Sequence, residues 1–244
     1  MLSVKPWRPL AVLIFFAALL FCICLGGVTS DLLRRLHVNG FREADDFGHI
    51  LFGTLAFQGS ACGLIILFWR HHQIGWRDGF GFNGPELKRA LRLALLVFLA
   101  ALPVVWLVQA ASVFTLTALG HPPDDQMAVQ LIDNAKSWWA RSYFAVFAVV
   151  LAPVTEEFIF RGLLYPFIKQ FGWPRLAFGG VSVLFALIHF DVATFLPLLL
   201  LALVLVWLYE KTDNLLAPIT VHALFNASNL AMLVLKHFYP DPKL

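Results

Sequence analysis

The stretch APVTEEFIFRG, from Ala152 to Gly162, places two adjacent carboxylates, Glu156 and Glu157, and the guanidinium of Arg161 inside a run otherwise apolar enough to lie in a bilayer. An ionisable side chain near the centre of a membrane helix costs roughly 2.5–3.5 kcal/mol on insertion scales. Three of them together are expected only where they pair, face a polar cavity or take part in chemistry. The surrounding sequence decides among these explanations.

The composition around this stretch is that of a membrane protein. Hydrophobic residues make up 60% of the 244 positions before glycine is counted, against about 45–50% with glycine in soluble domains. Charged residues are only 14% and gather in short clusters between apolar runs, as in polytopic helical proteins. The net charge of +3 comes with no long basic run, so we expect no nucleic-acid partner.

Apolar runs predict the helices directly. The run that carries the charged stretch covers residues 142–167, and six further runs lie at 9–28, 47–69, 92–119, 176–189, 195–209 and 215–235. Most of them reach the roughly 17–25 residues that a membrane span needs. The sequence therefore predicts an all-α, polytopic membrane helical bundle of about seven (six to eight) transmembrane helices, a single membrane domain over residues 1–244 with its motif-bearing core at 142–235.

The connecting loops carry a weak orientation signal. With seven spans, 10 Lys and Arg residues fall on the side of the N-terminus and 7 on the other, which favours a cytoplasmic N-terminus. The first span could be a cleavable signal peptide, but no A-x-A-like site follows it, so we expect an uncut anchor. The weakly amphipathic segment 127–139 ends in Trp138 and Trp139, which predicts a position at the membrane interface.

Helical spacing divides the charged stretch into two parts. Glu157 and Arg161 are four residues apart, so they share a helix face and can form an ion pair, whereas Glu156 points about 100 degrees away. Pro153 removes a backbone hydrogen bond and can open the helix. An ion pair that holds helices together explains Glu157 and Arg161 but leaves the second glutamate without a role.

Two further polar sites follow on later apolar segments. His189 ends an apolar run that contains Phe185, and His222 and Asn226 share one helix face. Taken singly, each suits ordinary hydrogen bonding between helices or at the interface. Together with Glu156 they suit hydrolysis: Glu156 and His189 would deprotonate a water, and His222 and Asn226 would donate hydrogen bonds to the oxygen of a tetrahedral intermediate.

These motifs, Glu-Glu-x-x-x-Arg, Phe-x-x-x-His and His-x-x-x-Asn in this order, resemble the signature of the CAAX-processing and bacteriocin-processing (CPBP, or ABI) family of intramembrane endopeptidases. The resemblance covers roughly residues 142–235. It implies a glutamate-dependent protease whose active-site and supporting residues occupy the matching positions of this chain. The positions matching Glu156 and His189 would activate water, those matching His222 and Asn226 would form the oxyanion hole, and those matching Glu157 and Arg161 would support the site.

The resemblance also sets the expected partners: a peptide or protein substrate with a membrane-proximal cleavage site, and the lipid bilayer. We expect no cofactor; zinc is conceivable from the histidines and glutamates, but the sequence has no His-Glu-x-x-His motif. The chain's size and lack of organelle signals favour a bacterial inner (plasma) membrane. Three alternatives remain: a non-proteolytic immunity or scaffold protein of the same fold, a eukaryotic CAAX prenyl-protein endopeptidase, and a proton-coupled transporter.

Overall fold

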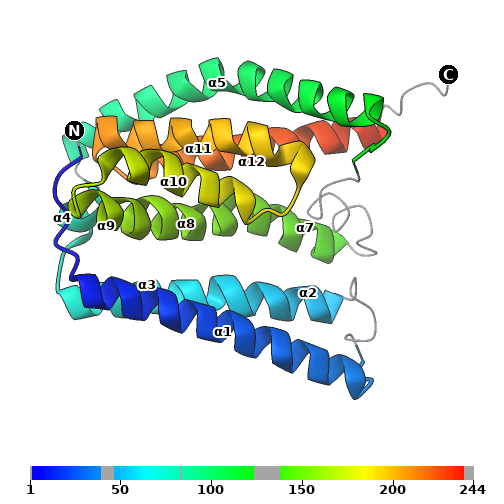
Figure 1. The fold of residues 1–244 in the computed structure, drawn as a ribbon, viewed down its shortest axis with the longest axis horizontal. Helices are drawn as coiled ribbons and strands as arrows, with labels where there is room; N and C mark the ends of the chain where they lie inside the picture. Colours follow the sequence, from blue (N-terminus) through cyan, green and yellow to red (C-terminus); the bar gives the residue numbers. More distant parts are fainter. Residues whose placement is uncertain (1, 40–46, 83, 124–137, 239–244) are drawn as a thin grey trace.

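The computed structural model describes residues 2–39, 47–82, 84–123 and 138–238 (Figure 1). In these residues seven long helical segments are present, with the small helix α4 (Trp76–Phe80) between the second and the third. They are α1 (Pro9–Arg35), α2 (Phe47–Thr54) continued by η1 (Leu55–Gly59) and α3 (Ser60–His72), α5 (Gly84–Ala118), the rod from α7 to α9 described below, α10 (Pro174–Leu187), α11 (Val192–Thr212) and α12 (Leu216–Phe238). Six of the segments are long and apolar enough to cross a membrane, and α10 is shorter. The predicted all-α polytopic bundle is confirmed.

The central rod is one helical segment of changing pitch. It runs through α7 (Trp138–Val146), η2 (Phe147–Leu151), α8 (Ala152–Glu157), η3 (Phe158–Leu164) and α9 (Tyr165–Gln170), in which the η pieces are π-helical. Each π turn accommodates an extra residue and shifts the side chains that follow around the helix axis. The charged stretch thus begins in a short α segment held between two π segments.

Helix α11 is the centre of the bundle, because it is apolar on all sides. Leu201, Leu205 and Leu208 pack with α5 and α12, while Ala202 and Val206 pack with η3, α10 and the first helices. A helix that is hydrophobic all round suits a protein core or a membrane span, and half of α11 is buried inside the bundle. In Figure 1, α11 accordingly lies among α5, α10 and α12.

The first two long segments form a separate helical hairpin. In Figure 1, α1 and the α2–α3 segment lie side by side as a layer next to the α8–α9 rod. The hairpin joins the rest of the bundle through aromatic packing, with the ring of Trp7 lying 5.3 Å from Phe68 and 5.7 Å from Phe80. The N-terminal segment, residues 2–8, is mostly extended and runs from this hairpin to the far ends of α9 and α11.

The start of α12 is fixed by the loop that precedes α5. The amide of Leu215 donates to the carbonyl of Phe80 over 2.9 Å, and Asn214 Nδ2 donates to that of Gly81 over 2.7 Å. Gly81 has a φ of +76°, and a Cβ there would lie 1.8 Å from the carbonyl oxygen of Asp213. Only glycine fits this close approach. The loop therefore sets the position from which α12 carries its polar residues into the bundle.

The expected interfacial segment lies mainly outside the described residues, since structure resumes at residue 138. Trp138 and Trp139 begin α7, where their rings stack 3.7 Å apart. Both are exposed, by 63% and 69%. An interfacial position for them remains a prediction.

Candidate active site

Glu157 is the centre of a buried polar cluster. Arg161 Nη1 donates to Glu157 Oε1 over 2.9 Å, and both side chains are 0% exposed. Arg161 Nη2 reaches the carbonyl of Ala202 on α11 over 3.2 Å. The ion pair expected from the i, i+4 spacing is present, and it also connects the rod to α11.

The same carboxylate holds the histidine of α12. His222 Nδ1 lies 2.8 Å from Glu157 Oε1. A carboxylate paired with arginine only accepts hydrogen bonds, so Nδ1 carries the hydrogen and donates it. Glu157 thereby fixes both the ring orientation and the tautomer of His222, and leaves its Nε2 without a hydrogen when the ring is neutral.

Glu156 faces that free nitrogen. Its Oε2 lies 3.8 Å from His222 Nε2, and its side chain is 14% exposed, whereas that of Glu157 is fully buried. The distance exceeds a direct hydrogen bond. Two adjacent glutamates thus differ in role, because one is committed to Arg161 and His222 and the other has its carboxylate oxygens available to a reactant.

His189 follows the end of α10. Its Nδ1 donates to the carbonyl of Phe185 over 2.7 Å, so Nε2 of the neutral ring is a hydrogen-bond acceptor and a possible base. The side chain is exposed and lies within electrostatic reach of Glu156. Among the described residues the two make no direct hydrogen bond, so a reactant would have to connect them.

Phe185 packs against three of these polar groups. Its buried ring lies 4.5 Å from the guanidinium carbon of Arg161, and its centroid is 5.0 Å from that of His189 and 5.6 Å from that of His222. A cation over an aromatic face is favourable by about 0.5–2 kcal/mol. Phe185 therefore orients both histidines and balances part of the cost of burying the arginine.

Asn226 is held one turn further along α12. Its Nδ2 donates to the carbonyl of Ala148 in η2 over 2.8 Å. One amide hydrogen is thus used within the protein, and the second remains for another acceptor. The structure brings Glu156, Glu157, Arg161 and His222 into one cluster, places His189 beside it, and attaches Asn226 to the rod nearby.

Within the described part of the chain, the cluster contains buried polar atoms without hydrogen-bond partners, which lower stability and are not required in an ion pair that only joins helices. Glu157 Oε2 and Arg161 Nε are buried and have no hydrogen-bond partner among the described residues. Buried polar atoms without partners are rare in native proteins and call for a functional or structural reason. Within the described residues, no group of three or more His, Cys, Asp or Glu side chains is arranged to hold a metal ion.

Sequence reasoning missed the backbone groups of the site. The carbonyl oxygens of Ala148, Phe185 and Ala202 each accept a hydrogen bond from a motif side chain. A backbone oxygen has no signature in the sequence, because every residue carries one. Only Pro153 hinted at a freed carbonyl.

Residues 137–228 match the family described as Rce1-like, type II CAAX prenyl endopeptidase. The similarity to this family lies in the part of the chain that carries the motifs. The match covers all three motifs and confirms the resemblance to CAAX-processing enzymes.

Two relatives from Lactococcus lactis subsp. lactis (strain IL1403) are similar to this chain. UPF0177 protein YxdF is 33% identical over 88 residues, which cover 34% of this chain and 48% of the relative. UPF0177 protein YaiF is 29% identical over 160 residues, covering 63% of this chain and 69% of the relative. The chain thus spans about half the length of the first relative. No solved structure shows a significant match to the chain.

Proposed function

We propose that this chain is an intramembrane endopeptidase that hydrolyses a peptide bond in a membrane-associated peptide or protein tail. The observation that carries the proposal is the division of labour between the two glutamates. Glu157 is spent on Arg161 and His222, whereas Glu156 faces His222 Nε2 at 3.8 Å and is part-exposed. The similarity of residues 137–228 to CAAX prenyl endopeptidases supports the reaction class.

In this proposal Glu156 is the general base. A water between Glu156 and His189 would give its proton to the Glu156 carboxylate as its oxygen attacks the scissile carbonyl carbon. The His189 Nε2 lone pair, left free by the Nδ1 bond to Phe185, would accept the second water hydrogen and orient the oxygen. When the carbon–nitrogen bond breaks, Glu156 returns its proton to the leaving amine.

His222 and Asn226 would stabilise the negative oxygen of the tetrahedral intermediate. Because Glu157 takes the Nδ1 hydrogen of His222, Nε2 can donate only when the ring carries a second proton. In this proposal the oxyanion donor is therefore an imidazolium, whose charge Glu157 and the oxyanion itself balance. The unused amide hydrogen of Asn226 would supply the second hydrogen bond. One such donor is worth about 10²–10³ in kcat.

We propose a reaction without a metal, in which Glu156 is the base and His222 and Asn226 are the oxyanion donors. The Nδ1 atoms of His222 and His189 are both engaged within the protein. A chelator should therefore leave the rate unchanged. Strong inhibition that zinc reverses would show that the mechanism is wrong. A position in a bacterial inner (plasma) membrane with a cytoplasmic N-terminus is part of the proposal.

The proposal is tested with Glu156→Gln and His189→Ala in the purified full chain, reconstituted in vesicles with a fluorogenic, lipid-anchored CAAX-type peptide. We expect each variant to lower kcat by about 10²-fold or more, since general acid–base catalysis contributes about 10²–10⁴. Glu86→Gln and His121→Ala are matched controls, because both residues are exposed and outside the cluster. A Glu156→Gln variant that cleaved at the wild-type rate would contradict the mechanism. A wild type that cleaved none of a series of such peptides would favour the scaffold alternative.

A further inference from the structure

Asn226 donates to the carbonyl of Ala148. That carbonyl is available because of the register of the helix and the proline at position 153. In η2 the amide of Ala152 bonds to the carbonyl of Phe147, five residues back. In the same register the amide at position 153 would bond to the carbonyl of Ala148. Position 153 is proline, which has no amide hydrogen. The Ala148 carbonyl is thereby left without this backbone donor.

Asn226 takes the vacated acceptor from 78 residues away, over 2.8 Å. An unpaired carbonyl in a partly buried position costs about 1–3 kcal/mol, so the amide and the carbonyl satisfy each other. Four residues earlier on the same face of α12, His222 bonds to Glu157. These two bonds connect α12 to the rod on both sides of Pro153 and fix how far along the rod each side chain lies.

We propose that Pro153 is a positioning residue for the oxyanion donors. Because Pro153 has no amide hydrogen to donate to the Ala148 carbonyl, that carbonyl accepts one from Asn226. The hydrogen bond between them directs the second amide hydrogen of Asn226 toward the substrate. The inference rests on the proposed function, because it assigns Asn226 a substrate contact. Pro153 itself touches no reactant.

A role in bending the helix is the simpler explanation for a proline, and it makes a different prediction. Pro103 also lies inside a helix, α5, and faces away from the protein core. If Pro153 only bends its helix, Pro153→Ala should change stability, and its effect on kcat should add to that of Asn226→Ala. If it reserves the Ala148 carbonyl, its replacement should act through Asn226.

The experiment compares Pro153→Ala, Asn226→Ala, the double variant and the control Pro103→Ala in reconstituted full-length protein with the same lipid-anchored peptide. Alanine at 153 restores an amide that competes for Ala148, at a position where alanine favours helix. We expect kcat to fall about 10–100-fold with KM unchanged, since a displacement near 1 Å can cost about 10²-fold. The thermal midpoint should not fall, and Pro103→Ala should keep the wild-type kcat.

Non-additivity is the decisive readout. If Pro153 acts through Asn226, Pro153→Ala should have little further effect in the Asn226→Ala background. Wild-type kcat in Pro153→Ala, a fully additive double variant, or activity lost in step with thermal stability would each overturn the inference. These outcomes differ from failure of the proposed function, which would appear as unchanged activity in Glu156→Gln.

Discussion

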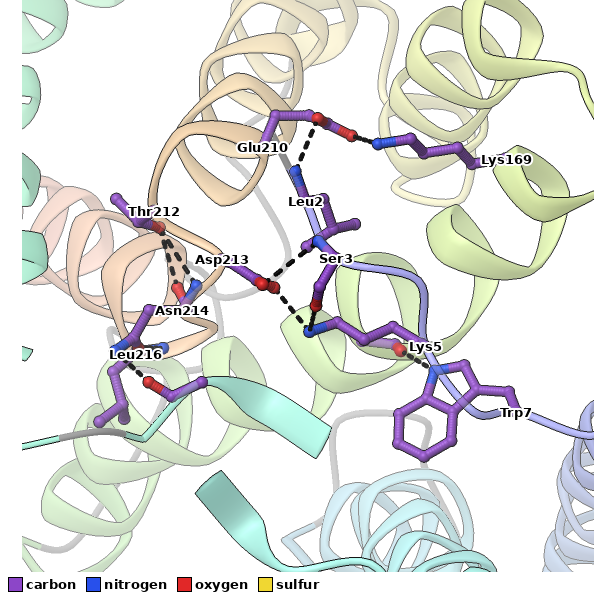
Figure 2. A network of polar contacts seen from close by, with 12 residues as sticks. Leu2, Ser3, Lys5, Trp7, Lys169, Glu210, Thr212, Asp213, Asn214 and Leu216 are labelled. Carbon is purple, nitrogen blue, oxygen red and sulfur yellow. Dashed lines mark hydrogen bonds and ion pairs between the residues drawn. The ribbon is translucent and has the colours of Figure 1, made fainter. Parts of the chain in front are cut away.

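Two of the ionic clusters in the described part of the chain differ in what surrounds them. The motif cluster, Glu157 with Arg161 and His222, lies in the middle of the rod, where the side chains are 0–4% exposed. The strap cluster lies at the end of the bundle, where Lys5 pairs with Asp213 at 2.6 Å and Lys169 pairs with Glu210 (Figure 2). In each strap pair at least one side chain reaches solvent, Asp213 by 35% and Lys169 by 26%.

The strap cluster attaches the N-terminal segment, residues 2–8, to the part of the chain that carries the motifs. In Figure 2 the backbone amides of Leu2 and Ser3 point to the carboxylates of Glu210 and Asp213, at 3.2 Å each. Further along the segment, Trp7 Nε1 donates to the carbonyl of Gly162 over 2.9 Å. These contacts hold together segments about 155–210 residues apart in the sequence.

The comparison separates two uses of charge in an apolar protein. When the buried partner of a strap pair is removed, the partly exposed partner can be hydrated, so the loss is small. When one motif partner is removed, a charge remains in a dry environment, so the loss is large. The charges of the motif cluster also orient the His222 ring, whereas the strap cluster only joins segments.

The largest expected effect is on Arg161. Arg161→Met leaves Glu157 fully buried without its ion-pair partner, which should lower the free energy of unfolding by about 3–5 kcal/mol and abolish cleavage. Glu156→Gln is the matched control, because it removes a charge one residue away from the ion pair and should change stability by less than about 1 kcal/mol. Chemical unfolding in detergent micelles measures both.

The double variant Arg161→Met with Glu157→Gln tests the cause of that loss. Removing both charges leaves no uncompensated ion, so stability should recover part of the way, while cleavage stays lost because His222 is no longer held by a carboxylate. A double variant as unstable as Arg161→Met alone would show that packing, and not charge, dominates at this site.

The sequence predicted the ion pair of the motif cluster and not the strap cluster, for a physical reason. Glu157 and Arg161 are neighbours through helix geometry, which spacing encodes. The motifs indicated that His222 belongs to the same site, but its contact with Glu157 was not predicted, because it joins two helices. Lys5 and Asp213 meet through the chain's tertiary path, and neither spacing nor resemblance to the motifs describes a contact between an extended segment and a helix end.

The helices themselves were largely predictable, and their irregularities were not. Long apolar runs require helices in a bilayer, because unpaired backbone groups are too costly there. The π turns at η2 and η3 depend on how the rod packs against α11 and α12, and no local pattern encodes them. This is why Pro153 was recognised as a break in hydrogen bonding while its partner, the Ala148 carbonyl, was not.

An intermediate effect is expected at Trp7, which lies in the same N-terminal segment as Lys5 but is buried. Trp7→Phe keeps an aromatic ring beside Phe68 and Phe80 and removes the donor to the Gly162 carbonyl. The free energy of unfolding should fall by about 1–2 kcal/mol, the cost of an unsatisfied buried acceptor. At temperatures where the variant is folded, kcat should equal that of wild type. Trp139→Phe, at an exposed residue, should change neither the free energy of unfolding nor kcat. A fall in kcat for Trp7→Phe would show that the N-terminal segment influences the active site.

The smallest effect is expected at Lys5, although its side chain is 1% exposed and its ion pair is as short as any in the motif cluster. Distance does not decide the outcome, because the partner Asp213 is 35% exposed and can be hydrated once the lysine is gone. Lys5→Met keeps most of the buried stem, so the loss should be no more than about 1 kcal/mol and should shrink further in high salt. Lys88→Met, at an exposed position, is the control. A loss as large as that of Arg161→Met would mean that burial of one partner alone sets the strength of these pairs, and the distinction between the two clusters would no longer hold.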